Sequence, residues 1–150
     1  MMTRTAARQL AVQLCFAASA GSDLSPEEFF SEEYFGTLPQ DEPVCAGMPD
    51  KAQKRYIITL VNGVAEHREE LDALISRYSH GWKIGRISKT ALSVLRCAIY
   101  EILYMPDIPA AASINEAVEL DKGYDEPETV SFVNGILGSI VRAGSDGEEK

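Results

Sequence analysis

Residues 88–138 read SKTALSVLRCAIYEILYMPDIPAAASINEAVELDKGYDEPETVSFVNGILG, and this stretch decides the fold. Apolar residues recur in it at helical spacing, which predicts three consecutive amphipathic helices. Pro106 and Pro109 separate the first helix from the second, because proline lacks the backbone donor that an interior helical turn needs. Gly123 is expected to end the second helix in a left-handed conformation, and Pro127 to begin the third. Apolar faces this wide must pack on one another, so the stretch predicts an all-α core.

Sequence motifs in the same stretch stand in a fixed order. Together they resemble the C-terminal half of NusB-type transcription antitermination factors, a family with an LRxAxYE helix, an IP turn, an INEAxEL helix and a closing FVNGxL helix. The combination is specific, although each motif alone is weak. The N-terminal RTAARQLAVQLCF is similar to the family's opening helix, less distinctively. The four motifs are LRCAIYE at 95–101, IP at 108–109, INEAVEL at 114–120 and FVNGIL at 132–137.

The segments before this stretch also favour helices. The string Ser25-Pro26-Glu27-Glu28 predicts a short aromatic-rich helix, followed by a surface loop at 36–50 that is rich in proline and glycine. Asp50 is expected to cap the next helix, which either continues past Glu66 or kinks there. The expected fold is all-α, with about seven helices in two small packed bundles, as the resemblance also implies. We expect one NusB-like helical domain over 1–150, with an N-terminal lobe at about 1–80, a C-terminal lobe at about 81–143 and an acidic, flexible tail at 144–150.

The composition excludes several classes of protein. With 150 residues and 45% apolar side chains, the chain is long enough to bury a core. No apolar run reaches the length of a membrane span, and we expect a cytoplasmic protein. The three cysteines form no C-x-x-C pair, and the chain has only two histidines and no catalytic fingerprint. We therefore expect no enzyme activity, no metal and no cofactor.

The net charge of −9 argues against a general nucleic-acid binder, but the charges are unevenly spread. Residues 1–22 carry Arg4 and Arg8 and no acidic side chain, whereas residues 23–50 carry acidic side chains and no basic one. Basic residues outnumber acidic ones in 51–105. Any contact with phosphates should therefore use the first helix and the middle segment, while most charges are expected to be solvated surface.

Arg4, Arg8, Val12 and Phe16 lie at four-residue spacing, on one edge of the first expected helix. Guanidinium groups bind phosphates and aromatic rings stack on unpaired bases, so this edge is a candidate RNA contact. Spacing alone favours the simpler interpretation, a helix end with Phe16 in the core. The resemblance shifts the balance, because the family uses its first helix and the start of its last helix for RNA. The residues that it implies for RNA binding are Arg4, Thr5, Arg8, Phe16, Glu128 and Phe132.

The resemblance also implies the function and the partners. The chain would bind boxA-type single-stranded elements of nascent ribosomal RNA together with the ribosomal protein NusE, and join the RNA polymerase antitermination complex. Lys89, Leu92 and Arg96 are the expected partner-binding residues, and Arg96 is also expected to pair with Glu116. Homodimerisation stays open.

Two other functions remain as alternatives. The chain could be a helical protein-interaction module with weakened or lost RNA binding, as its acidity and sparse arginines suggest. It could also assist RNA modification, because NusB-like domains occur fused to RNA cytosine methyltransferases.

Overall fold

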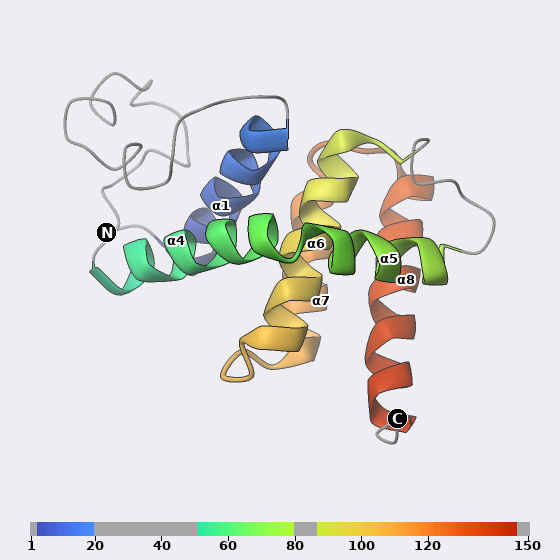
Figure 1. Cartoon of the computed structure of the whole chain (residues 1–150). Helices are drawn as coiled ribbons and strands as arrows, with labels where there is room; N and C mark the ends of the chain where they lie inside the picture. Colours follow the sequence, from blue (N-terminus) through green and yellow to red (C-terminus); the bar gives the residue numbers. More distant parts are fainter. Residues whose placement is uncertain (1–2, 20–50, 80–86, 147–150) are drawn as a thin grey trace. The chain divides into compact units, whose positions relative to one another are not determined.

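The computed structural model describes residues 3–19, 51–79 and 87–146, and every regular element in these ranges is a helix (Figure 1). The predicted helix after Ser25 and the predicted loop at 36–50 lie outside the described residues. So do residues 80–86, and the lobe boundary near residue 80 therefore stays a prediction. The helices are α1 (Arg4–Ser19), α4 (Lys51–Glu66), α5 (Arg68–Tyr78), α6 (Lys89–Tyr104), α7 (Ala110–Asp121) and α8 (Pro127–Asp146).

The helices group into two compact units, residues 1–66 and 67–150. In the first unit α1 packs against α4 (Figure 1). Burying these apolar side chains stabilises the pair by roughly 1.5–3 kcal/mol for each large one. The buried apolar residues of this unit are Ala7, Leu10, Ala11, Val12 and Cys15 of α1, and Ile57, Leu60, Val61 and Val64 of α4.

In the second unit α6, α7 and α8 pack on one another, and α5 packs against α6 and α8. The helical periodicity of 88–138 is thus confirmed as three packed helices. Leu103, near the C-terminal end of α6, lies off the buried face and is 41% exposed. The most deeply buried apolar residues are Leu71 and Ile75 of α5, Val94, Leu95 and Ile99 of α6, and Val133, Ile136 and Leu137 of α8.

The helices of this unit begin and end near the residues that the sequence predicted, with one correction. Ser88 caps α6, since its side chain accepts a hydrogen bond from the Ala91 N–H at 3.0 Å. Helix α7 does not end in a left-handed residue. Its C-cap is Lys122, in the right-handed helical region, and Gly123 closes the turn by donating its N–H to the Leu120 carbonyl at 3.1 Å. No positive φ is recorded at Gly123.

The α4–α5 connection resolves the alternative that the sequence left open. Helix α4 ends at Glu66, and α5 begins at Arg68, with His67 as a turn residue between them. The helix therefore breaks here. His67 has φ −107° and ψ 17°, and its side chain forms no cap for α5.

A buried hydrogen bond ties α7 to α6. The Ser113 hydroxyl donates to the Glu101 carboxylate at 2.8 Å, and the two residues are 1% and 0% exposed. A buried carboxylate needs such donors, because leaving it unbonded costs far more than the net gain of the bond. Glu101 closes the LRCAIYE motif, which explains why that motif ends on a charged residue inside a helix interface.

Candidate nucleic-acid interface

The first turn of α1 is the part of the predicted RNA site that is best placed for solvent contact. Thr3 caps the helix, since its hydroxyl accepts the Ala6 N–H at 3.0 Å and its carbonyl accepts the Ala7 N–H at 2.9 Å. Arg4 and Thr5 follow and are exposed. No acidic side chain lies in this turn. The positive end of the helix and the Arg4 guanidinium therefore face solvent together, an arrangement that favours an anion.

Arg8 behaves differently from its neighbours on the same edge. It is only 5% exposed, and its guanidinium carbon lies 5.9 Å from the centroid of the Tyr56 ring of α4. That distance is typical of a cation–π contact. Phe16, further along α1, is 37% exposed. The predicted edge thus offers Arg4, Thr5 and Phe16 to solvent and holds Arg8 inside the α1–α4 pair.

At the start of α8, Glu128 is exposed and Phe132 is half-buried. Both lie apart from a groove of about 830 Å³ between α7 and α8, because residues 127, 130, 131 and 134 line that groove from a different face of the helix. The groove has an apolar floor and two exposed amides, Asn115 and Asn134. No motif in the sequence analysis indicated this groove. Its lining residues are Ala111, Ile114, Asn115, Val118, Glu119, Lys122, Asp125, Pro127, Val130, Ser131 and Asn134.

The predicted partner-binding residues of α6 become progressively more buried along the helix. Lys89 is exposed, Leu92 is half-buried and Arg96 is 6% exposed. The Arg96 guanidinium forms a bidentate ion pair with Asp72 of α5, at 2.8 Å from Nε to Oδ1 and 3.1 Å from Nη2 to Oδ2. The expected pairing of Arg96 with Glu116 is therefore wrong. Arg96 ties α6 to α5, and Lys89 and Leu92 are the members of this set that face outward.

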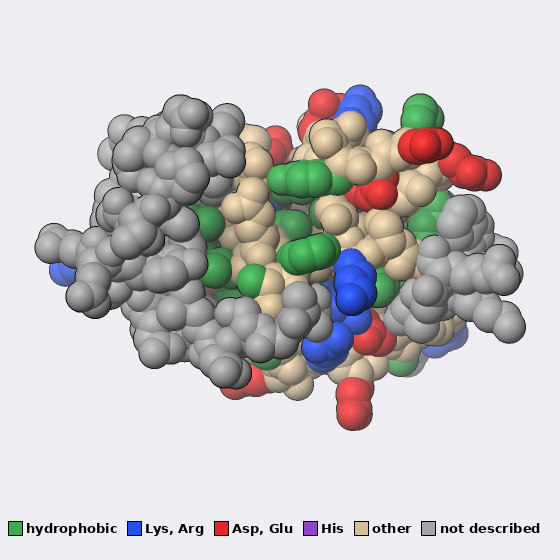
Figure 2. Space-filling view, turned by 90° about the horizontal axis from the view of Figure 1, so that it is seen from above, with side chains coloured by type: hydrophobic (Ala, Val, Ile, Leu, Met, Phe, Trp, Pro, Cys, Tyr) green, Lys and Arg blue, Asp and Glu red, His purple; other side chains and the backbone are tan. Residues whose placement is uncertain are grey.

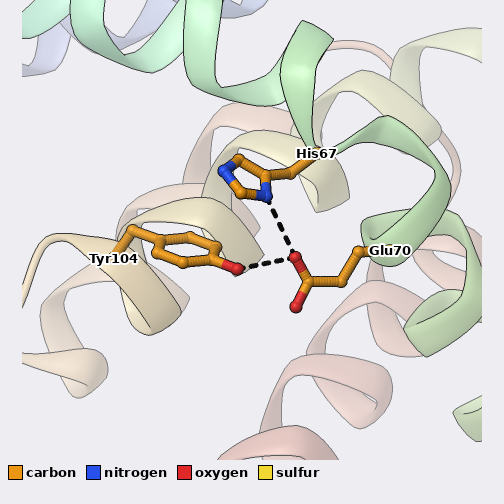
Figure 3. A network of polar contacts seen from close by, with 3 residues as sticks. All are labelled: His67, Glu70 and Tyr104. Atoms are coloured by element: carbon orange, nitrogen blue, oxygen red, sulfur yellow. Dashed lines mark hydrogen bonds and ion pairs between the residues drawn. The ribbon is translucent and has the colours of Figure 1, made fainter.

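A polar and aromatic network at the α5–α6 contact was not anticipated from the sequence (Figure 3). The Glu70 carboxylate accepts a hydrogen bond from the Tyr104 hydroxyl at 2.6 Å, and lies 3.1 Å from His67 Nδ1. The His67 ring stacks on Tyr104 at 4.5 Å between centroids. The hydrogen bond to Glu70 raises the pKa of Tyr104. No motif or spacing in the sequence indicates that these residues are neighbours, because Tyr104 lies at the C-terminal end of α6, the helix that follows α5.

The surface charge of the described residues is mixed. On the face drawn in Figure 2, Lys and Arg side chains form small groups beside Asp and Glu side chains, and no continuous basic area covers it. Isolated cations of this kind give only weak and salt-sensitive contacts with a nucleic acid.

Within 3–19, 51–79 and 87–146, no group of three or more His, Cys, Asp or Glu side chains is arranged to hold a metal ion. No helix in these ranges is long and apolar enough to cross a membrane.

Comparison with known proteins gives a consistent result. The model of the NusB family matches residues 5–142. The chain is 39% identical to the transcription antitermination protein NusB of Acetivibrio thermocellus, over 99% of this chain and 97% of that one. It is also 31% identical to the solved structure of T. maritima NusB, with a TM-score of 0.67, over 95% and 93% of the two chains.

A further solved structure shares the fold at lower identity. It is a complex of the antitermination factors NusB and NusE with dsRNA. The matched chain is 23% identical, with a TM-score of 0.74 over 93% of this chain and 96% of that one.

Proposed function

The chain belongs to the NusB family, and we propose that it acts as an RNA-binding transcription antitermination factor. It binds boxA-type elements of nascent ribosomal RNA transcripts together with the ribosomal protein NusE, and through them joins the RNA polymerase antitermination complex. It works in the cytoplasm, where those transcripts are made, and it is not an enzyme. The observation that carries this proposal is the match of the family model to residues 5–142, together with a relative of nearly equal length that is named for antitermination.

The exposed residues of α1 support an RNA contact of limited strength. Arg4 supplies a cation beside the positive end of the helix, and Phe16 offers a ring on which an unpaired base can stack. Each phosphate contact adds about one unit to the salt slope of binding. A site with so few exposed cations has low affinity by itself, so a second protein must supply much of the binding free energy.

The platform for that second protein is proposed to be the outer face of α6. Lys89 and Leu92 are exposed and half-buried there, and the Arg96–Asp72 ion pair fixes α6 against α5 beneath them. Arg96 thus positions the platform without lying on its surface. Glu128 and Phe132 remain the proposed RNA residues of α8.

Titration of a fluorescently labelled boxA RNA tests the proposal. The RNA is titrated with this chain alone, with NusE alone and with both. We expect weak binding by either protein and markedly tighter binding by the pair. Equal, negligible binding in all three titrations would exclude the proposed function.

A matched pair of variants locates the RNA contact. Arg4→Ala should weaken the ternary complex and reduce its salt slope by about one. Arg55→Ala removes the same charge from an exposed position on α4 and should leave RNA binding unchanged. Equal effects of the two variants would mean that only net charge matters, and would refute the α1 site.

A second candidate function is a protein-interaction module with weakened or lost RNA binding. The burial of Arg8 and the net charge of −9 favour it. It predicts that NusE binds this chain normally while Arg4→Ala and Phe16→Ala leave RNA binding unchanged. The same titrations therefore separate the two functions.

A further inference from the structure

Asp121, the last residue of α7, is a buried acid without an evident counterion. The residue is 0% exposed, and neither carboxylate oxygen has a hydrogen-bond partner in the described part of the chain. A carboxylate in this environment would lose its hydration and gain nothing in return. Burial therefore favours the protonated form of the side chain over a wider pH range than for an exposed aspartate.

The neighbouring carboxyl of Asp125 offers an acceptor for that proton. The turn after α7 brings the two residues together, because the Tyr124 and Asp125 N–H groups both donate to the Asp121 carbonyl at 2.9 Å. Asp125 Oδ2 also accepts a hydrogen bond from the Ser88 hydroxyl at 3.2 Å. Ser88 in turn caps α6 by accepting the Ala91 N–H. A continuous chain of polar groups thus runs from the end of α7 to the start of α6.

Among the residues that the structure describes, no cation on the surrounding elements lowers the pKa of Asp121. Burial is the first cause that raises the pKa of Asp121 to about 7, and the Asp125 carboxyl is the second. Two of the cations have partners elsewhere: Lys122 pairs with Glu119 at 2.8 Å, and Arg96 pairs with Asp72. The remaining charged groups of α6, of the turn and of the first turn of α8 are Lys89, Glu101, Glu126 and Glu128, and none of them is a cause of the shift.

We propose that Asp121 keeps its proton in the folded chain and donates it to Asp125, so that these two carboxyls and Ser88 form a pH-sensitive latch between α7 and α6. Below the transition, one proton joins the two carboxyls and Ser88 stays fixed as the cap. Above it, the proton leaves to solvent, and two adjacent carboxylates repel each other, one of them buried. This carboxyl latch holds the end of α6 that carries Lys89 and Leu92, but its existence does not depend on the proposed RNA function.

The direction of the pH effect follows from linkage. The pKa of Asp121 is raised in the folded chain, so its stabilising contribution is fully present below the unfolded value of 3.8 and is lost as the pH rises through about 7. Between those two values the unfolding equilibrium constant should rise by about tenfold for each pH unit, because one proton is released on unfolding.

Asp121→Asn tests the latch, because its amide supplies a permanent donor to Asp125 and has no charge to lose. Urea unfolding of wild type and variant is measured from about pH 5 to about pH 8. The wild type should become less stable relative to Asp121→Asn by about tenfold per pH unit up to the transition, and the gap should then level off. Asp107→Asn, an exposed acid in the α6–α7 turn, is the matched control and should show a gap that barely changes with pH.

A constant gap between wild type and Asp121→Asn would overturn the proposal. If that variant fails to fold, carbon-13 NMR titration of the wild-type Asp carboxyls decides the question. One Asp that titrates far above the usual range supports the latch, and ordinary titration of every Asp excludes it. Exchange of the Ala91 amide hydrogen gives a local measure. Relative to an amide at the middle of α6, it should become less protected as the latch opens.

Discussion

The ion pair between Arg96 and Asp72 should make a measurable contribution to the stability of the second unit. The Arg96 side chain is 8% exposed and the Asp72 side chain 28%, so solvent screens the pair only in part. Two unit charges about 4 Å apart attract by about 4 kcal/mol at an effective dielectric constant of about 20. Desolvation and the ordering of two side chains offset part of that attraction. Since hydrogen bonds to charged groups contribute roughly 1.5–3 kcal/mol, we expect a coupling free energy in that range.

A double-mutant cycle measures this coupling. Asp72→Asn, Arg96→Met and the double variant are unfolded in urea beside the wild type. Asp72→Asn alone should cost roughly 2–3 kcal/mol, since it leaves the Arg96 charge buried and unpaired. For a chain of this length the melting temperature should then fall by about 4–12 °C. The double variant should recover part of the loss.

A second cycle supplies the control. Glu116, the partner first expected for Arg96, should show no coupling to Arg96 beyond about 0.5 kcal/mol when it is changed to Gln. Additive losses in the Asp72 cycle would refute the reasoning. So would a coupling in the Glu116 cycle as large as the one expected for Asp72.

Three further substitutions test individual contacts. Ser88→Ala removes the cap of α6 and should cost about 1 kcal/mol by urea unfolding. Ser113→Ala leaves a buried carboxylate oxygen of Glu101 without its donor and should cost about 1–3 kcal/mol, with no effect on RNA binding. Arg8→Ala should lower the melting temperature because it removes a side chain packed inside the α1–α4 pair, whereas Arg4→Ala should leave it unchanged. The two arginine variants are compared by calorimetry, and equal melting temperatures would contradict the burial of Arg8.

The helices could be predicted from the sequence because their signals are local. In 88–138, apolar residues at helical spacing indicated α6, α7 and α8, and prolines and glycines marked where these helices begin and end. The partner of Arg96 could not be found in this way. It lies on a preceding helix, twenty-four residues away in the chain, and no spacing rule relates the two positions. Which helix a charged side chain faces depends on how the helices rotate as they pack, and this is a property of the whole core.

The carboxyl latch illustrates a second limit of the sequence. Asp121 follows the INEAVEL motif, and three acids stand in the next seven positions, so it resembles one more solvated charge. Its burial results from how α6 and α8 close over the end of α7. The sequence offers one indication of this burial: Asp121 follows Ala117 by four residues and therefore lies on the buried face of the same helix. An acid on the buried face of a helix must either keep its proton or have a hydrogen-bonding or ionic partner.

The geometry of α1 shows why four-residue spacing overstated the edge that is proposed to bind RNA. A helix advances about 100° per residue, so each four-residue step drifts by about 40° around the axis. From Arg4 to Phe16 the row therefore turns through about 120°, and every part of it before Phe16 lies on the arc that carries Ala7, Ala11, Cys15 and Val12 into the core. Arg8 falls within that arc and packs on Tyr56, while Arg4 escapes burial at the first turn. Arg4 and Phe16 are then about 18 Å apart along the axis, so an RNA that uses both must touch α1 at two separated points. A double variant of Arg4 and Phe16 should accordingly lose the product of the two single effects, because residues this far apart act independently.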